Sequence, residues 1–306
     1  MTSSVDARVQ RALFLRKQAF LGALPAAALF ALEKGARDVV LRSGEKLPAP
    51  NDEQTLIAAV VDGTLSARQA DGTERLIGPG GLAGLTHVLA EAPRMALEAT
   101  RPTRLLLVDD ETLEELIERY FVVVEVLIHH LARSSLAALA TLPDGTALGA
   151  SEAGRPKRVE ALDFVDRLAM LTHAESIPPE SLNALSELAG QVHERRWRPG
   201  EILWRAGEPA EDFLVMAEGS IECAMGAGRH HHLGYGASVG KYEALIGLPR
   251  RFTAVVAQPL TALVVNRDLF FDLLEDHGGM ARDFLRALAR RKQALESMLA
   301  PSHPES

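Results

Sequence analysis

One spacing recurs along this chain and constrains its fold more than any other feature. Gly44-Glu45 returns 156 residues later as Gly200-Glu201, and Asp62-Gly63-Thr64 returns at the same distance as Glu218-Gly219-Ser220. The other landmarks at this offset are Gly78, Gly80 and Gly84 with Gly234, Gly236 and Gly240, and Pro93-Arg94 with Pro249-Arg250. A constant offset through separate landmarks indicates a duplication. The 306 residues are therefore predicted to form two copies of one unit.

Each copy shows the same order of patterns. Helical segments come first, then short alternating strands punctuated by glycines, then a loop with a helical turn, and finally a strand and a closing helical stretch. This order predicts an α+β fold of two β-roll (jelly-roll-like) domains in tandem, each flanked by helices. The domains are expected over 1–142 and 158–306, joined by a Gly-, Ala-, Ser- and Pro-containing linker over 143–157. Asp110 and Asn266 are expected to cap the closing helices.

Composition argues against several classes of protein. The net charge of −8 disfavours a nucleic-acid binder, which needs a basic face for phosphates, so no DNA partner is expected. The single cysteine, Cys223, rules out a disulfide within the chain and is expected to be a buried, inert thiol. A cytoplasmic location fits this cysteine usage. No run is expected to reach the roughly 18 apolar residues of a membrane span.

An apolar segment near the start, FLGALPAAALFAL (20–32), has the look of a short secretory signal. Its Leu29 and Leu32 correspond at the repeat offset to Leu185 and Leu188, which belong to a polar helical segment. The segment is therefore predicted to be a helix of the folded first copy.

The repeated loop offers a site for an anion. It reads AGLTHVLAEAPRMALEA (83–99) in the first copy and VGKYEALIGLPRRFTAVVA (239–257) in the second. A glycine that leads into a short helix directs backbone N–H groups into one space, and an arginine brought back there adds a planar fork for phosphate oxygens. Gly84 with Arg94, and Gly240 with Arg250, fit this geometry. The alternative is that the arginine only ends a surface turn with a salt bridge.

These glycine turns, the spacing from Gly to Pro-Arg and the trailing helices resemble the cyclic nucleotide-binding domain of catabolite activators, kinase regulatory subunits and gated channels. The resemblance covers about 5–142 and 158–300. It implies a β-roll with a phosphate-binding cassette, F-G-E-x-A-L followed by P-R-S/T-A-T. In that family the Arg pairs with the cyclic phosphate, the Glu accepts from the ribose 2′-OH, and the closing helices respond to occupancy.

Both loops depart from the cassette at the Glu. Leu85 follows Gly84 in the first copy and Lys241 follows Gly240 in the second. Lys241 and Arg251 would add charge beside Arg250 and favour a ligand more anionic than a cyclic monophosphate, or an acidic partner; alternatively, both point to solvent. No cofactor is required, and the missing Glu weakens the expectation of cAMP, cGMP or a dinucleotide. The candidate site residues are Gly240, Lys241, Arg250, Arg251 and Thr253, with Gly84 and Arg94.

Three further features bear on partners. His230-His231-His232 is expected in a solvated turn between strands rather than in a metal site. The last helix is basic through Arg282, Arg286, Arg290, Arg291 and Lys292, as a solvated face or a patch for an acidic partner. The apolar helix after Phe121 needs a surface beyond its own roll, and either closing helix is a candidate homodimer contact.

The sequence shows no Ser/His/Asp or Cys/His arrangement, P-loop or metal-ligand cluster, so no enzyme is predicted. The chain is predicted to be a regulatory protein with two divergent cyclic nucleotide-binding domains that acts through a protein partner. The alternative is a scaffold, independent of ligand, with degenerate sites.

Overall fold

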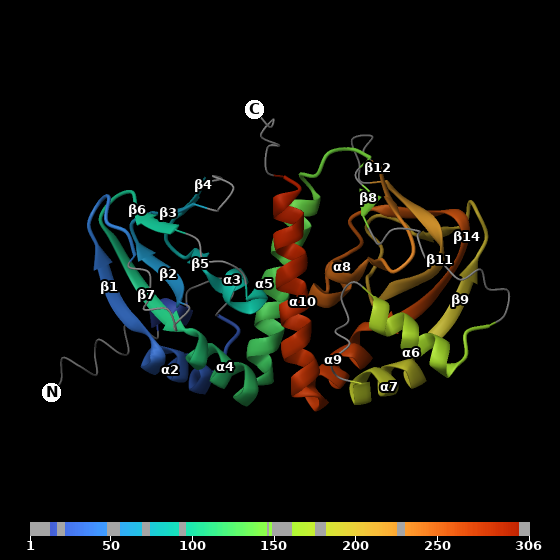
Figure 1. Ribbon diagram of the computed structural model, residues 1–306, viewed down its shortest axis with the longest axis horizontal. Coiled ribbons are helices and arrows are strands. Elements are labelled where there is room, and N and C mark those ends of the chain that lie inside the picture. Colours follow the sequence, from blue (N-terminus) through green and yellow to red (C-terminus); the bar gives the residue numbers. More distant parts are fainter. Residues whose placement is uncertain are drawn as a thin grey trace. The chain divides into compact units, whose positions relative to one another are not determined.

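The computed structural model describes residues 13–16, 22–47, 56–68, 74–91, 96–145, 147–148, 161–174, 182–224 and 230–299. It divides into two compact units, the first formed by 1–131 with 292–306 and the second by 132–291. Helices and strands are mixed in both, as predicted (Figure 1). The limits at 142 and 158 stay a prediction. Part of the expected linker, Ala147–Leu148, is strand β8, which pairs in parallel with a strand of the second unit.

The first unit contains two antiparallel sheets. The four-stranded sheet has the order β1-β7-β2-β5 and the three-stranded sheet the order β4-β3-β6. Its elements are α2 (Ala26–Gly35), β1 (Arg37–Leu41), β2 (Leu56–Asp62), β3 (Leu65–Arg68), β4 (Glu74–Ile77), β5 (Leu82–Ala83), α3 (Leu85–Ala90), β6 (Ala96–Ala99), β7 (Thr103–Asp109), α4 (Asp110–Arg119) and α5 (Phe121–Leu139). Apolar residues on the facing sides of the strands form its core.

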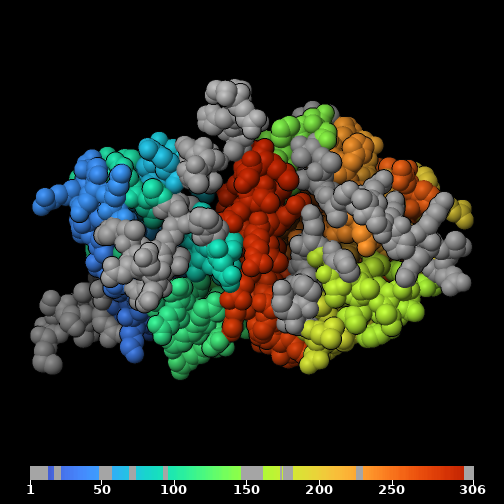
Figure 2. Space-filling view, viewed as in Figure 1, coloured from blue at the N-terminus to red at the C-terminus, as the bar shows by residue number. Residues whose placement is uncertain are grey.

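The second unit is built around two long strands, and the first unit has pairs of shorter strands in their places. β11 and β14 pair along most of their length, and β10, β12, β8, β9 and β13 complete the sheet. Its elements are β8, α6 (Phe164–His173), α7 (Leu182–Gln191), β9 (His193–Trp197), β10 (Ile202–Trp204), β11 (Asp212–Ala224), β12 (His230–Leu233), β13 (Ser238–Val239), α8 (Lys241–Ile246), β14 (Thr253–Asn266), α9 (Arg267–Asp276) and α10 (Gly278–Ser297). One face of α10 lies at the surface in Figure 2, in red.

The predicted repeat recurs in the backbone. Helices α3 and α8 begin and end 156 residues apart. Ile57 pairs with Val108 in the first unit, and Phe213 pairs with Val265 in the second, so the same register is kept with one residue added after the loop. Most of the glycines that define the repeat have positive φ angles in both units, as at Gly44 and Gly200, Gly80 and Gly236, and Gly84 and Gly240.

Gly63 and Gly219 show why a glycine is needed at one of these places. Their φ angles are 95° and 90°, which residues with a Cβ rarely adopt. A Cβ at Gly63 would collide with the backbone of Pro102 and Thr103, and one at Gly219 with that of Pro259 and Leu260. Because these glycines have no side chain, their backbone can lie directly against the backbone of the facing residues.

The closing helical stretches are each two helices. α4 ends before Tyr120 and α9 before His277, and a longer helix follows each break. Asn266 caps α9, as predicted, by accepting from the backbone N–H groups of Asp268 and Leu269. The cap predicted at Asp110 is wrong, because Asp109 is the residue that accepts from Thr112 N, at 2.9 Å. Asp110 lies already inside the first turn, where a carboxylate favours the helix dipole.

Two further predictions concern apolar helices. The signal-like segment contributes α2, and Leu29 and Leu32 are buried like Leu185 and Leu188 of α7. The expectation that no run reaches the length of a membrane span is wrong for α5, which is long and apolar enough by length and composition. The core helix of a soluble protein meets the same test, and 56% of this window is buried inside the structure.

The prediction of a turn for the histidine run is wrong. Residues 230–233 form β12, which pairs with β11 in antiparallel register from Ile221↔Leu233 to Ala224↔His230. His231 is buried at 2% exposure, because alternate residues of a strand face the same side. Among the residues that the structure describes, no group of three or more His, Cys, Asp or Glu side chains is placed to hold a metal ion.

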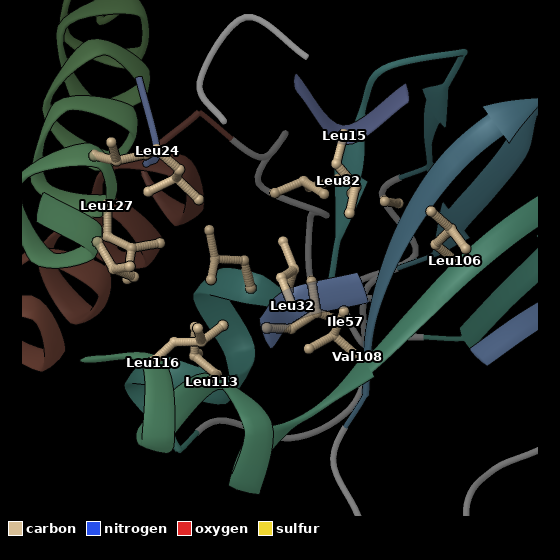
Figure 3. A pocket seen from close by; sticks show the side chains of 14 residues that line it. Leu15, Leu24, Leu32, Ile57, Leu82, Leu106, Val108, Leu113, Leu116 and Leu127 are labelled. Atoms are coloured by element: carbon tan, nitrogen blue, oxygen red, sulfur yellow. The ribbon is translucent and has the colours of Figure 1, made fainter. Parts of the chain in front are cut away.

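An apolar cavity of about 60 Å³ lies in the first unit, among side chains of the sheet strands β2, β5 and β7 and of helices α2 to α5 (Figure 3). Its lining consists of Leu15, Leu24, Leu32, Ile57, Ala59, Leu82, Leu85, Leu106, Val108, Leu113, Leu116, Val123, Val126 and Leu127.

Substituting Gly219 with alanine is expected to lower the free energy of unfolding by ~2 kcal/mol or more, since strain at positive φ adds to a backbone collision. Gly247→Ala is the matched control. Gly247 has φ 63° with nothing within 4 Å of an added Cβ, and its counterpart Glu91 already adopts φ 54°. The control should cost about 1 kcal/mol. Urea unfolding measures both, and equal losses would contradict the close-approach argument.

Candidate functional site

The loop of the second unit has the predicted shape. Gly240 takes a left-handed conformation and caps α8, Gly247 ends the helix in the same conformation, and the chain then returns through Pro249 to Arg250. A Cβ on Gly240 would collide with the Arg250 guanidinium, so glycine is needed for the arginine to pack against the start of the helix. The sequence thus brings Gly240 and Arg250 together as expected.

The guanidinium of Arg250 is bound by the chain itself. Its Nη1 donates to the Gly240 carbonyl oxygen at 3.0 Å, and its Nη2 donates to the Asp212 carbonyl oxygen at 2.8 Å and to Asp212 Oδ1 at 2.6 Å. Its Cζ lies 4.0 Å from the centroid of the Trp204 ring, in a cation–π contact. Arg250 is 4% exposed. The fork predicted to meet a phosphate therefore meets a carboxylate and two carbonyl groups.

Burial and the carboxylate act on this arginine in opposite directions. Burial lowers the pKa of Arg250, and the charge of Asp212 and its hydrogen bond raise it. Arginine stays protonated throughout the physiological range, so the buried charge needs its partner. The carboxylate of this ion pair is in contact with water, because the Asp212 side chain is 43% exposed.

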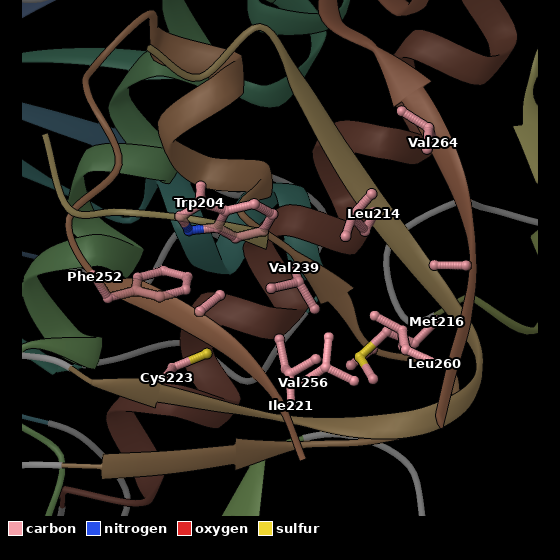
Figure 4. Packing of buried hydrophobic residues seen from close by; sticks show 13 residues of the cluster. Trp204, Leu214, Met216, Ile221, Cys223, Val239, Phe252, Val256, Leu260 and Val264 are labelled. Atoms are coloured by element: carbon pink, nitrogen blue, oxygen red, sulfur yellow. The ribbon is translucent and has the colours of Figure 1, made fainter. Parts of the chain in front are cut away.

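Two large rings occupy the inside of the second roll. Trp204 and Phe252 are 6% and 8% exposed, meet edge to face with centroids 5.8 Å apart, and belong to the core cluster with Val239, Cys223 and Val256 (Figure 4). Cys223 is a buried thiol, as predicted, and burial raises its pKa. Trp204 thus lies between the Arg250 guanidinium and the Phe252 ring, in contact with both.

The side chain of Lys241 does not point to solvent. Lys241 is 3% exposed, and its ammonium lies 4.8 Å from the centroid of the Tyr242 ring. Every residue of α8 is buried. The lysine that replaces the family's Glu is thus part of a packed helix.

Sequence reasoning missed a carboxylate in this loop. Glu243 is 2% exposed, and the backbone N–H groups of Glu243 and Arg251 hydrogen-bond to its carboxylate. Burial raises the pKa of Glu243, against these hydrogen bonds and the charges of Arg250 and Arg251. The sequence carried a signal for this residue. Glu243 lies three residues after Gly240, whereas the Glu of the family cassette follows its glycine directly.

The other two predicted residues lie apart from Arg250. Arg251 is exposed, and its Nη1 donates to the Leu136 carbonyl oxygen at 3.5 Å. Thr253 is half-buried, and its Oγ1 accepts from the backbone N–H of Ala206 at 3.1 Å. Neither of these hydrogen bonds involves Arg250, and the part predicted for Arg251 and Thr253 in a ligand site stays a prediction.

A cleft of about 420 Å³ borders the outer side of the same loop. It is lined by Gly207, Pro209, Ala210, Glu211, Gly247, Leu248, Pro249, Asn266, Arg267 and Asp268. Arg250 is not among these residues, because its side chain turns inward, toward Trp204.

The described part of the first unit's loop keeps the backbone of the second and has a leucine in the place of the lysine. Gly84 is left-handed at φ 89° and caps α3, and Leu85, in the place of Lys241, is 4% exposed. Arg94 lies outside the residues that the structure describes. In the described part of this loop, a buried apolar side chain stands where the second unit has a buried cation.

The second unit is thus a roll of antiparallel strands with a glycine-capped short helix and a returning arginine. Residues 194–277, from β9 to the end of α9, match the family model of the cyclic nucleotide-binding domain. The second unit is therefore similar to this family over these residues, as the sequence resemblance predicted.

Two curated proteins are similar over part of their length. The acetyltransferase Pat of Mycolicibacterium smegmatis is 31% identical over 116 residues, 37% of this chain and 34% of its own. The HTH-type transcriptional regulator Cmr of Mycobacterium tuberculosis is 28% identical over 111 residues, 35% of this chain and 46% of its own. The chain thus spans a third to a half of the length of these relatives. Among solved structures, the regulatory domain of Toxoplasma gondii PKA, in a co-crystal with cAMP, covers 95% of this chain and 97% of its own, at 16% identity and a TM-score of 0.36.

Arg250→Ala is expected to destabilise the ligand-free protein by about 2 kcal/mol, because it removes the hydrogen bonds to Gly240 and Asp212 and opens space beside Trp204. Arg251→Ala, one residue on and exposed, is the control and should change stability by less than about 0.5 kcal/mol. Thermal or urea unfolding measures both. If Arg250 served only to bind a ligand, both variants would lose little stability, which would contradict this expectation.

Glu243→Gln is expected to stabilise the protein at neutral pH, and more at pH 8 than at pH 4. The raised pKa of Glu243 means that the folded state binds its proton more tightly than the unfolded state. This stability is complete below the ordinary pKa of glutamate and is lost as pH rises through the folded value. Unfolding midpoints of both proteins across this range give the difference, and a gain that is the same at both pH values would contradict it.

Proposed function

We propose that this chain is a non-enzymatic regulatory protein of two cyclic nucleotide-binding-type domains in tandem, which acts through a protein partner and does not need cyclic nucleotide in its second domain. The observation that carries the proposal is the engagement of Arg250 by Asp212, Gly240 and Trp204. The repeated register of the first unit supports the tandem arrangement.

The energetics of the second loop support independence from cyclic nucleotide. A phosphate that reached Arg250 would have to displace the Asp212 carboxylate, so one charge-assisted pair would replace another with little net gain. Lys241 removes the acceptor for the ribose hydroxyl, and a buried donor left unpaired costs roughly 1–3 kcal/mol. Trp204 and Phe252 would also have to leave the core cluster.

One observation favours a second candidate, a sensor of a small ligand. In the described part of the chain, Arg250 Nε, Trp204 Nε1 and Glu243 Oε1 are buried and have no hydrogen-bond partner. Buried polar atoms are normally paired, so such atoms mark a place where a ligand or water binds. A ligand that suits them presents an acceptor to the two N–H groups and a donor to the carboxylate.

The two curated relatives are, by name, an acetyltransferase and a transcriptional regulator. The stretch that they share with this chain is a third to a half of each, and we take that stretch to be regulatory and not catalytic. The net charge of −8 favours a protein partner over DNA. A cytoplasmic location, with the single thiol reduced, is part of the same proposal.

The long closing helices are the surfaces that we propose for the partner, a second copy of the chain included. The basic face predicted for α10 is partly neutralised, since Arg286 pairs with Asp283, and Lys292 is buried and donates to Glu296 at 2.7 Å. Arg290 of α10 is exposed. A partner with an acidic contact fits this face.

Thermal unfolding with a panel of cAMP, cGMP and cyclic dinucleotides tests the proposal. The expected result is no shift of Tm with any of them. A ligand at 100 times its Kd would stabilise the folded state by about 2.7 kcal/mol, so binding would be visible. A saturable shift that Arg251→Ala keeps and Asp212→Ala strengthens would contradict the proposal and favour the sensor.

A further inference from the structure

The cavity of the first unit is lined only by aliphatic side chains. All fourteen lining residues are Leu, Ile, Val or Ala, and most of them are buried (Figure 3). Its volume of about 60 Å³ corresponds to several water molecules, but a water needs two to four polar partners, which this lining does not offer. Such a cavity is dry and suits an apolar guest.

The second unit shows what a filled version of this space looks like. Ile57, Leu113 and Leu127 line the cavity. The counterpart of Ile57 is Phe213, 156 residues on, and the counterparts of Leu113 and Leu127 are Phe270 and Phe284, 157 residues on, because one residue is added after the loop. The rings of Phe213 and Phe270 meet edge to face with centroids 5.5 Å apart, and those of Phe270 and Phe284 with centroids 5.0 Å apart. All three are exposed by 1% or less. The first unit thus keeps a space that the same fold closes with three aromatic rings.

The cavity reaches the loop that gives the family its ligand site. Leu85, the first residue of α3, is part of the lining, and it stands where the second unit has Lys241. Leu113 of α4 and Leu127 of α5 line it from the helices that close the unit. A guest in the cavity would therefore touch both the loop helix and the closing helices.

We propose that the first unit binds a small aliphatic ligand, or the end of an aliphatic chain, in this cavity. The apolar lining supplies the affinity by removing the ligand's surface from water. The volume is well below the about 150 Å³ of a cavity that holds benzene, so the guest is a compact aliphatic group and not an aromatic ring. The inference concerns the first unit and holds whether or not the second unit binds a nucleotide.

Xenon is the probe for the test, with NMR of the methyl groups of the full chain. Saturable shifts are expected for the methyls of Ile57, Leu85 and Leu127. Leu127→Phe, which introduces the ring that the second unit carries, should weaken this binding at least about tenfold. Ile57→Phe is a second filling variant, for the case that the first does not fold.

Phe284→Leu is the matched control, since it makes the opposite change in the second unit. It should leave the xenon shifts of the first unit unchanged. The absence of saturable shifts at Leu85 and Leu127 in the wild type would overturn the proposal. Shifts that persist in both filling variants would overturn it as well, because xenon would then be bound elsewhere. The nucleotide panel does not bear on either outcome.

Discussion

The second unit depends on how one buried guanidinium is satisfied. Arg250 joins the start of β11 at Asp212, the cap of α8 at Gly240, and β10 at Trp204. A buried charge without partners would be far more costly than the contacts that it makes, so these three elements must meet at one point. The contact explains why position 240 has no side chain and why the short helix after it is buried on every residue. It also places the large ring of Trp204 inside the roll.

The two copies share one backbone fold but differ in the side chains that fill its interior. In the second unit the space beneath the sheet holds Phe213, Phe270 and Phe284, and the loop holds a cation. In the first unit aliphatic residues replace the rings, Leu85 replaces the lysine, and a cavity remains. Four glycines with positive φ are kept in both units, among them Gly63 with Gly219 and Gly84 with Gly240, because their turns need them whatever the core contains. Duplication followed by exchange of core side chains thus gives one charged and one apolar interior on the same frame.

Local patterns predicted the frame well and the partners of its side chains poorly. The repeat could be predicted because most of its glycines have positive φ angles that the backbone requires at those positions. The cap at Asn266 and the burial of Cys223 could be predicted as well. The pairing of Arg250 with Asp212 could not, since 38 residues separate them and only the register of β11 brings them together. The prediction of a turn for the histidine run failed for a related reason. Pairing with β11 determines its structure, and the composition of the run alone does not. The roles of Glu243 and Trp204 likewise follow from the depth at which the fold buries them.

The central claim is that Asp212 takes the place of a ligand for Arg250. A double-mutant cycle of unfolding free energies, with Asp212→Asn and Arg250→Lys alone and together, measures their coupling in the ligand-free protein. The account predicts a coupling of about 1–2 kcal/mol, reduced from that of a fully buried pair because Asp212 is 43% exposed. A coupling near zero would contradict it, since the arginine would then gain nothing from the carboxylate and would be left to a ligand.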